Sequence, residues 1–241
     1  MAASQETSRR ESILEAAAIV ISRRGVDAAR MADIAEEAGV SLGLVQHYFR
    51  HRDRLLEEVF RHELERISLT WRSFVEPESP PLERLIDYCA LTVPTGSDYE
   101  SRELGPRWGF WLELWSKAHR DDAIAAHVPG VYSSFSAPFT QAIEDGIADG
   151  LFAPRSAVPD VIDRLIAMID GLAVQTLVAG RPNGRMLALL VDALCGELGL
   201  DEQRSKQAQT YARAVGRRLS LDTSPDRKAG AARGRRRRAA A

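Results

Sequence analysis

The sequence lacks the features that mark exported, membrane-bound or disulfide-linked proteins. Its first residues, MAASQETSRRES, contain no apolar run of the kind found in signal peptides, and no window approaches the roughly 18 to 20 apolar residues of a membrane span. Only two cysteines occur in 241 residues, Cys89 and Cys195, and they form no CxxC pair, so neither a disulfide framework nor a thiolate zinc site is expected. We therefore expect a soluble, cytoplasmic protein with no membrane partner and with both thiols buried in its core.

The motifs of common enzyme classes are also missing. The chain has no HExxH, no GxxxxGKS phosphate loop and no GxGxxG. His47 and His51 are four residues apart, but they lie on either side of the expected end of a short helix, which argues against a shared metal ion. The sequence thus predicts a protein that is not an enzyme and has no cofactor and no metal site.

The net charge is small overall, but the charges are unevenly distributed. The formal net charge is only -2, yet residues 1–62 carry -1, residues 63–226 carry -8, and residues 227–241 carry seven basic and no acidic residues. An acidic body with a strongly basic tail invites a nucleic-acid hypothesis without proving it. The tail sequence GRRRRAAA resembles a nucleic-acid-binding tail, and a solvated, dispensable terminus explains it equally well.

Helical spacing is what the sequence does have, and no convincing strand pattern interrupts it. A first helix should begin near Ser8 or Ser12 and stop at Gly25. A long helix from Asp53, about two dozen residues in length, should end at the proline-rich segment EPESPP, and LFAPRSAVP should form a loop. Further helices are expected over residues 31–38, 42–49, 82–93, 102–119, 121–149 with a bend at Pro129 and Gly130, 160–180, 185–198 and 201–219.

Residues 34–49, IAEEAGVSLGLVQHYF, are the most informative stretch. Ala35 permits close approach of a neighbouring helix, Gly39 can adopt the left-handed conformation that ends a helix, and Ser41 can cap the next one. This pattern indicates a helix-turn-helix, in which two helices meet across a short turn. The alternative is an αα-corner in an unrelated helical protein, with its polar residues merely solvated.

If the motif binds DNA, the second of its helices should enter the major groove. Its exposed N-terminal part would then bring Leu42, Gly43, Leu44, Gln46, His47 and Tyr48 to base edges and phosphates. Gln46 suits adenine, and His47 and Tyr48 suit phosphates. Arg50, Arg52 and Arg54 follow directly and could hold the phosphate backbone.

The run GVDAARMADIAEEAGVSLGLVQHYFRHRDRLLEEVF resembles the DNA-binding domain of TetR-type regulators, and HYFRHRDRLLE is most similar to the BetI-like branch. The resemblance covers the chain from Glu11 to about Phe60. It implies DNA contacts at Leu42, Gly43, Leu44, Gln46, His47, Tyr48 and Arg52, with Arg30 contributing from the preceding helix. The chain departs from the family in having Arg30 where Thr or Ser is common, and in lacking the usual aromatic residue at position 46, which leaves the operator sequence open.

The last two long helices, expected over residues 160–180 and 185–198 and here called the closing helix pair, are each apolar around more than half of their circumference. One face can meet the chain's own core, and the other needs a partner. A two-fold dimer through a four-helix bundle satisfies this need and presents two recognition helices to a palindrome. A hairpin fully buried in a monomer is the alternative. The stretch MIDGL, residues 168–172, resembles the dimer helix of TetR-type proteins.

Aromatic residues gather on two neighbouring helices. Trp108, Trp111 and Trp115 repeat every three or four residues, as do Tyr132, Phe135 and Phe139. Such stripes are as often plain core as ligand pocket. Together with acidic residues expected nearby, namely Glu103, Glu113 and Asp170, they predict a pocket that favours a cationic or amphipathic effector.

These observations predict an all-α protein with an N-terminal three-helix helix-turn-helix domain and a C-terminal helical domain for ligand binding and dimerisation. Residues 1–52 would bind DNA, residues 53–221 would bind a small-molecule effector and form the homodimer, and residues 222–241 would be a disordered basic tail. The predicted function is a transcriptional regulator, a repressor released from a palindromic double-stranded DNA operator by its ligand. A helical scaffold or adaptor without DNA-binding activity is the alternative.

Overall fold

The computed structural model describes residues 2–94, 108–179 and 183–219, and its regular secondary structure in these ranges is entirely helical. The all-α prediction is thereby confirmed. No described helix is long and apolar enough to cross a membrane. The predicted disorder of the basic tail concerns residues outside the described ranges.

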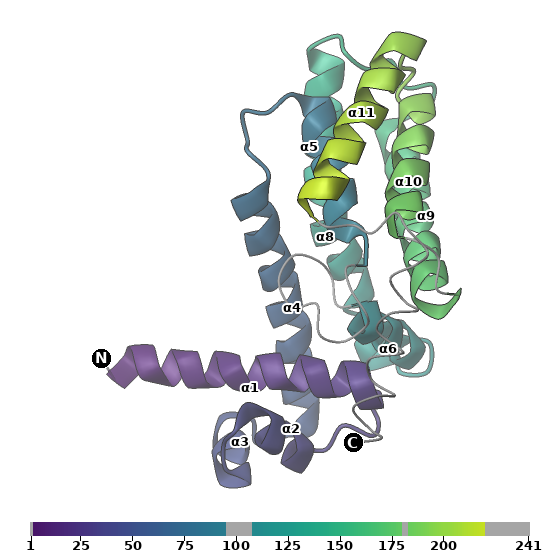
Figure 1. Cartoon of the computed structure of the whole chain (residues 1–241). Helices are drawn as coiled ribbons and strands as arrows, with labels where there is room; N and C mark the ends of the chain where they lie inside the picture. The colour runs from purple at the N-terminus through teal and green to yellow at the C-terminus, as the bar shows by residue number, and fades with distance from the viewer. Residues whose placement is uncertain (1, 95–107, 180–182, 220–241) are drawn as a thin grey trace, which may run out of the picture.

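The N-terminal helices form a compact unit, here called the head. It consists of α1 (Ala2–Arg24), α2 (Met31–Ala38) and α3 (Leu42–Tyr48). In Figure 1 the head lies at one end of the molecule, and α4 (Arg52–Phe74) rises from it toward the remaining helices, while α1 runs across α4. Buried Ile13 and Ile21 of α1 meet Val45 of α3 and Val59 of α4 in one core cluster, as the apolar stripe on the first helix predicted.

The remaining helices are here called the body. They are α5 (Pro81–Thr92), α6 (Trp108–Ala118), α7 (Asp122–Ala125), α8 (Val128–Ala148), α9 (Val158–Ala179), α10 (Asn183–Glu197) and α11 (Glu202–Arg218). In Figure 1 α5, α8, α9, α10 and α11 stand side by side in the upper part of the molecule, whereas α6 lies lower, beside the end of α1. Several large aromatic side chains hold them together, and Phe139 is fully buried against Trp71 of α4 and Tyr88 of α5. Cys89 and Cys195 are buried free thiols, as expected.

The prediction of one bent helix over residues 121–149 was wrong. The segment is divided into the short α7, capped by Asp121, and α8, which begins at Val128 with Pro129 in its first turn. Proline has no N–H, so the first turn of a helix tolerates it, whereas a helix interior would lose a hydrogen bond there. Pro129 therefore starts a helix rather than bending one.

Two other boundaries differ from the sequence prediction. Helix α1 begins at Ala2, ahead of the expected start near Ser8 or Ser12. Helix α9 begins at Val158, inside the segment expected to be a loop. Helix α11 is a complete helix: the Asp201 side chain accepts a hydrogen bond from the Arg204 N–H at 2.8 Å, and Ala208, Ala212 and Val215 are buried. The expected start of α6 near residue 102 lies outside the described residues.

Candidate nucleic-acid interface and ligand pocket

The turn between α2 and α3 has the geometry that its sequence predicts. Gly39 lies in the left-handed region at φ 66°, its N–H donates to the Glu36 carbonyl, and the Val40 N–H donates to the Ala35 carbonyl at 2.9 Å. These two bonds satisfy the last carbonyls of α2. The Ser41 hydroxyl then caps α3 by accepting a hydrogen bond from the Leu44 N–H at 3.2 Å. The two helices are thus held as a helix-turn-helix.

One side of α3 is anchored and the other is exposed. Val45 is completely buried against the head, whereas Leu42 is 41% exposed although it is apolar. Gly43, Gln46 and His47 are also exposed, and Leu44 and Tyr48 are half-buried. The predicted contact residues therefore share one surface, because the single buried residue Val45 fixes how α3 is turned.

The arginines around the turn have different surroundings. Arg30 is exposed and precedes α2 without capping it by its side chain; instead its backbone N–H donates to the Asp33 carboxylate at 3.2 Å. Arg52 is half-buried, and its guanidinium donates to the Val26 carbonyl. Arg50 and Arg54 are exposed, and Arg54 pairs with Glu58 at 3.2 Å. The fixed position of Arg52 ties the start of α4 to the segment after α1.

A second candidate site lies in the body, where three helices enclose an aromatic pocket, here called the aromatic box. Helix α6 contributes its tryptophans, α8 contributes Tyr132 and Phe135, and α9 contributes Asp170. The indole N–H of Trp108 donates to the Thr92 carbonyl at 2.8 Å. The buried indole N–H of Trp111 has no hydrogen-bond partner among the described residues. The residues lining the box are Trp108, Trp111, Trp115, Val131, Tyr132, Phe135 and Asp170.

The polar centre of the box is a hydrogen-bonded pair from α8 and α9. The Tyr132 hydroxyl donates to Asp170 Oδ2 at 2.9 Å, and Trp115 lines the box together with this pair. Burial raises the pKa of Asp170 to about 6, and the bond from Tyr132 opposes that shift. Burial and the neighbouring carboxylate also raise the pKa of Tyr132. Asp170 therefore places a costly negative charge next to the faces of aromatic rings, an arrangement that attracts a cation.

The structure gathers most of the predicted pocket residues but not all of them. Phe139 follows Phe135 by one turn and packs in the core against Trp71, so it does not line the box. Glu113 points away from it, toward the head, and Glu103 lies outside the described residues. Val131 was missed, because an isolated valine beside the aromatic stripe carries no signal of its own. An α-helix rises about 1.5 Å per residue, so Phe139 lies about 10 Å along α8 from Tyr132.

The box is nearly closed in this conformation. Its cavity measures about 20 Å³, which is room for roughly one water molecule. Pockets that hold small organic ligands usually measure at least about 300 Å³. Binding of an organic effector would thus require side chains of the box to move.

Helix α6 connects the box to the head. Its Glu113 accepts a hydrogen bond from the Val26 N–H at 3.2 Å, and its Lys117 pairs with Asp27 at 3.0 Å. At Gly25, φ is 86° and an added Cβ would lie 2.9 Å from Glu113, so glycine allows this close approach. The same helix therefore carries the box tryptophans and the polar contacts to the head.

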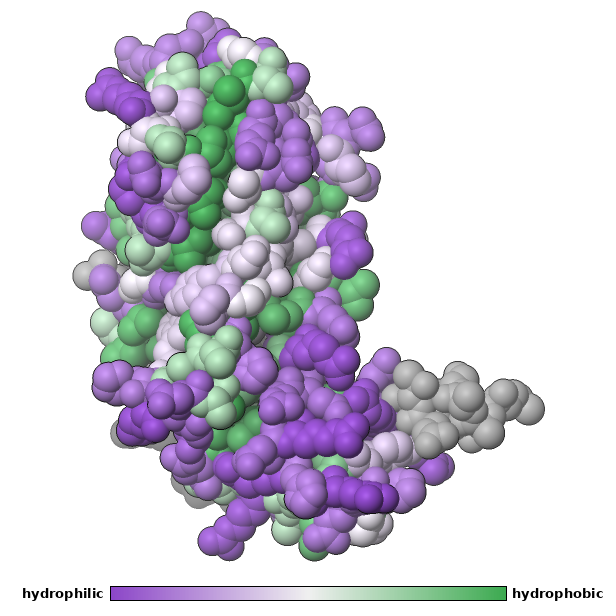
Figure 2. Space-filling model, turned by 180° about the vertical axis from the view of Figure 1, so that it is seen from behind, coloured by the Kyte–Doolittle hydropathy of each residue, from purple (hydrophilic) through white to green (hydrophobic). Residues whose placement is uncertain are grey.

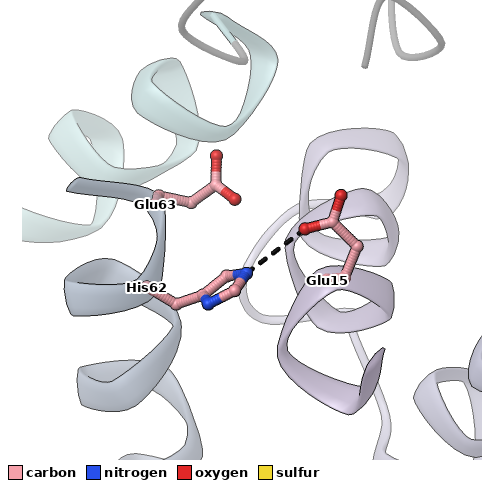
Figure 3. A group of neighbouring side chains, drawn as sticks. All are labelled: Glu15, His62 and Glu63. Atoms are coloured by element: carbon pink, nitrogen blue, oxygen red, sulfur yellow. Dashed lines mark hydrogen bonds and ion pairs between the residues drawn. The ribbon is translucent and has the colours of Figure 1, made fainter. Parts of the chain in front are cut away.

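A polar cluster joins α1 to α4 at the base of the body. Figure 3 shows Glu15 of α1 facing His62 and Glu63 of α4. His62 Nε2 lies 3.2 Å from Glu15, and buried Glu63 accepts hydrogen bonds from Arg66 at 3.1 and 3.3 Å. The donor atoms of Glu15, His62 and Glu63 lie within 4.8 Å of one another. Because Arg66 already brings positive charge to Glu63, we interpret the cluster as a polar contact that holds α1 and α4 together.

The outward face of the α9–α10 pair carries several small residues among charged and polar ones. Ala167 and Gly171 of α9 and Ala188 and Gly196 of α10 are exposed, while the large apolar side chains of both helices point mainly into the chain's own core. Val178, near the end of α9, is 76% exposed. In Figure 2 a hydrophobic stripe follows the upper part of the molecule, whereas the end that contains the head is mostly hydrophilic.

Two family matches cover most of the chain. Residues 13–59 match the family described as bacterial regulatory proteins, tetR family, and residues 81–199 match the family described as BetI-type transcriptional repressor, C-terminal. The HTH-type transcriptional regulator BetI of Paraburkholderia phymatum is 28% identical over 186 residues, which cover 75% of this chain and 87% of that protein. BetI of Burkholderia cenocepacia is also 28% identical, over 75% of this chain and 88% of its own.

Solved structures show the same fold. A transcriptional regulator from Saccharomonospora viridis, crystallised in complex with choline, is 26% identical and has a TM-score of 0.67, covering 77% of this chain and 95% of its own. A TetR-family regulator from Rhodococcus sp. has a TM-score of 0.69 at 22% identity, covering 79% and 99%.

Proposed function

Because this chain belongs to the TetR family of bacterial transcriptional regulators, we propose that the exposed surface of α3 reads a palindromic operator and that a small organic cation controls this reading from the aromatic box. The chain is a DNA-binding regulator whose C-terminal part is of the BetI repressor type. A cytoplasmic location, where operator DNA is found, is part of the proposal.

The observation that carries the DNA-binding proposal is the orientation of α3. Val45 holds the helix to the head, and Gln46 and His47 point to solvent on its other side. This leaves a polar, unobstructed surface of the kind that enters a major groove. We propose base-edge or phosphate contacts from Leu42, Gly43, Leu44, Gln46, His47 and Tyr48, with phosphate contacts from Arg30 and Arg50. Ser41 supports the surface by capping α3, and Arg52 supports it by positioning α4.

The test is selection of bound fragments from a random DNA library by the purified full chain. We expect a palindrome whose half-sites are one helical turn of DNA apart, because two-fold protein dimers read two-fold DNA. Gln46→Ala should alter the base preference at one position in each half-site, and Gln203→Ala, an exposed glutamine of α11, should alter none. Recovery of unrelated fragments by the wild-type chain would refute sequence-specific reading.

We propose that the dimer forms through the outward faces of α9 and α10. Small exposed residues such as Gly171 and Ala188 let a second helix pair approach closely, and proteins of this family dimerise. Among the residues that the structure describes, a Cβ added at Gly171 meets nothing within 4 Å, and the same holds for Gly130 of α8. Gly171→Arg should therefore yield folded monomers in sedimentation experiments and Gly130→Arg should stay dimeric; a dimeric Gly171→Arg would place the interface elsewhere.

The effector proposal depends on the combination of Asp170 with aromatic walls. A carboxylate with a pKa raised by burial gains from a cation beside it, and indole faces attract cations as well. The similar regulator from Saccharomonospora viridis was crystallised with choline, a small organic cation. We therefore propose quaternary ammonium compounds as the effector class of this chain. Calorimetric titration with choline and tetramethylammonium tests the proposal, and absence of heat from every such cation would refute it.

We propose that α6 transmits effector binding to the head. In this proposal the bound effector displaces tryptophans of α6, and the same helix contacts Val26 and Asp27 through Glu113 and Lys117. Such a shift would tilt α4, change the spacing of the two recognition helices and weaken operator binding by about 5- to 150-fold. Glu113→Ala should reduce this effector-induced loss of operator affinity without changing the affinity for the effector. Glu144→Ala, at an exposed position of α8, should leave the loss of operator affinity unchanged. An unchanged loss in Glu113→Ala would exclude this route.

A further inference from the structure

A groove outside the aromatic box lies between α8 and α9. Its volume is about 480 Å³, far more than the 20 Å³ of the box itself. The residues lining it are Tyr132, Ser133, Ser136, Ile162, Asp163, Ile166, Ala167 and Asp170. Unlike the box, this groove has enough room for a small organic molecule without any rearrangement.

The groove and the box share two residues, Tyr132 and Asp170. These are the residues joined by the 2.9 Å hydrogen bond from the tyrosine hydroxyl to the carboxylate. Any molecule that moves directly from the groove into the box must pass this pair. The bond therefore connects the two helices across the boundary between the two spaces.

The lining of the groove is suited to cations. It carries the carboxylates of Asp163 and Asp170 and the hydroxyls of Ser133 and Ser136, and the described residues that line it include no lysine, arginine or histidine. Ile162 and Ile166 add apolar surface that would contact alkyl groups. A small alkylammonium ion matches this lining, whereas a carboxylate or phosphate would meet two negative charges and no positive one.

We propose that the α8–α9 groove is an entry site for alkylammonium effectors and that the Tyr132–Asp170 hydrogen bond is the gate between this site and the aromatic box. The proposal rests on the effector proposal above and adds the route, a first binding site and the residues that control passage. The cation first binds beside Asp163 and Asp170. The hydrogen bond from Tyr132 to Asp170 then breaks, the Asp170 carboxylate contacts the cation instead, and the Tyr132 ring turns aside.

The exchange replaces the hydroxyl beside Asp170 with a positive partner. The Tyr132 hydroxyl loses Asp170 as its acceptor and donates to water in the open groove instead. Inside the box the cation lies against indole faces, which compensates for the water it has left. No covalent step is involved, so the gate can close again as the cation leaves.

The test is stopped-flow tryptophan fluorescence of the full chain, with choline chloride and tetramethylammonium chloride as probes. Ser133→Phe places a ring in the groove at an exposed position, and Ser134→Phe, an exposed neighbour that does not line the groove, is the control. We expect Ser133→Phe to slow association and dissociation by about tenfold each while Kd stays within about twofold, because an obstructed route alters rates but not end states. The Ser134→Phe protein should match the wild type.

A second variant tests the gate itself. Tyr132→Phe removes the hydroxyl but keeps the ring, and it should speed association by about threefold or more. Wild-type rates in both Ser133→Phe and Tyr132→Phe would overturn the proposal and leave the effector class intact. A changed Kd with unchanged association in Ser133→Phe would likewise overturn it, because the groove would then not lie on the route. If the wild-type chain binds neither probe, the entry site and the effector proposal fall together, while operator binding is unaffected.

Discussion

In the head, the polar side chains of α3 face solvent, whereas in the body the half-buried polar pair Tyr132–Asp170 lies against tryptophans. Gln46 and His47 remain hydrated until a partner arrives, so they cost the fold little. Asp170 is held beside aromatic rings at a raised pKa of about 6, which makes the unliganded body less stable than it could be. A surface site for a large polyanion can thus be preformed at little cost to stability. A buried site for a small cation holds an unfavourable negative charge, and the bound cation compensates that charge.

The largest predicted effect tests whether head and body unfold together. Phe139 is fully buried against Trp71 and Tyr88, so Phe139→Ala should lower the free energy of unfolding by about 3 to 5 kcal/mol through lost contacts and a cavity. Urea denaturation followed by circular dichroism should show one shifted transition, because a continuous core joins head and body. Leu69→Ala, at a 63% exposed position of α4, should change stability by less than about 0.5 kcal/mol. A separate, unshifted head transition would show that the two regions are independent.

The next prediction concerns pH and a second buried carboxylate of the body. Burial raises the pKa of Asp87 of α5 to about 6, although Arg218 and the Tyr211 hydroxyl of α11 both contact it at 3.3 Å; Glu83 adds to the rise. A carboxyl group with a raised folded-state pKa binds its proton more tightly in the folded chain. Its stabilising contribution is complete below about pH 4 and is lost as the pH rises through 6.

One pKa unit corresponds to about 1.36 kcal/mol. Between pH 4 and 7.5 the free energy of unfolding of the wild type should therefore fall by up to about 3 kcal/mol more than that of Asp87→Asn. Denaturation across this range measures it, with Asp192→Asn, an exposed carboxylate of α10, as the control. Asp170 has the same raised pKa and should leave a residual slope in the Asp87→Asn protein. Identical pH profiles for Asp87→Asn and the wild type would contradict the assignment.

A smaller effect is expected at the DNA-binding surface, where a substitution should lower operator affinity without lowering the stability of the fold. Gln46 is exposed, so Gln46→Ala should leave the unfolding midpoint unchanged. Loss of a bidentate contact to a base should weaken binding to the selected operator by about 1 to 3 kcal/mol and leave non-specific binding nearly unaltered. Fluorescence anisotropy with operator and scrambled duplexes distinguishes the two. Equal losses on both duplexes would indicate a phosphate contact instead.

The smallest predicted effect concerns the cap of α3. The Ser41 hydroxyl accepts one hydrogen bond, from the Leu44 N–H, so Ser41→Ala should cost about 1 kcal/mol locally. Hydrogen exchange of the α3 amides should accelerate, while the amides of α8 keep their protection. Ser41→Asp should restore protection, since aspartate is an equally good cap. Faster exchange throughout the body would show that the cap supports more than α3.

The features recovered best from the sequence are those that depend on neighbouring residues. Gly39 and Ser41 predicted the end of α2 and the start of α3, and both act in the structure as expected. The aromatic spacing on α6 and α8 predicted that these faces would meet. It could not predict which ring along α8 reaches the box, and so Phe139 was placed there although it packs against α4 and α5.

Glu113 and Arg52 show why the remaining assignments required the fold. Both were linked to ligands on grounds of charge and proximity in sequence, and both hydrogen-bond to Val26, which is far from Glu113 in the chain. A charged side chain pairs with a polar group that lies close to it in space. The distance between Glu113 and Val26 depends on how α1 and α6 cross. No local pattern reports such a crossing.

By itself the sequence determined the helices, the sharp turn before α3 and the family, because these follow from periodicity, capping and a contiguous motif. Only the tertiary structure decided that Tyr132 and Asp170 stand between a closed aromatic box and an open groove, and that α6 joins the box to the head. The physical reason is that capping and periodicity act between neighbours in the chain. A cavity and its walls exist only after distant helices have packed.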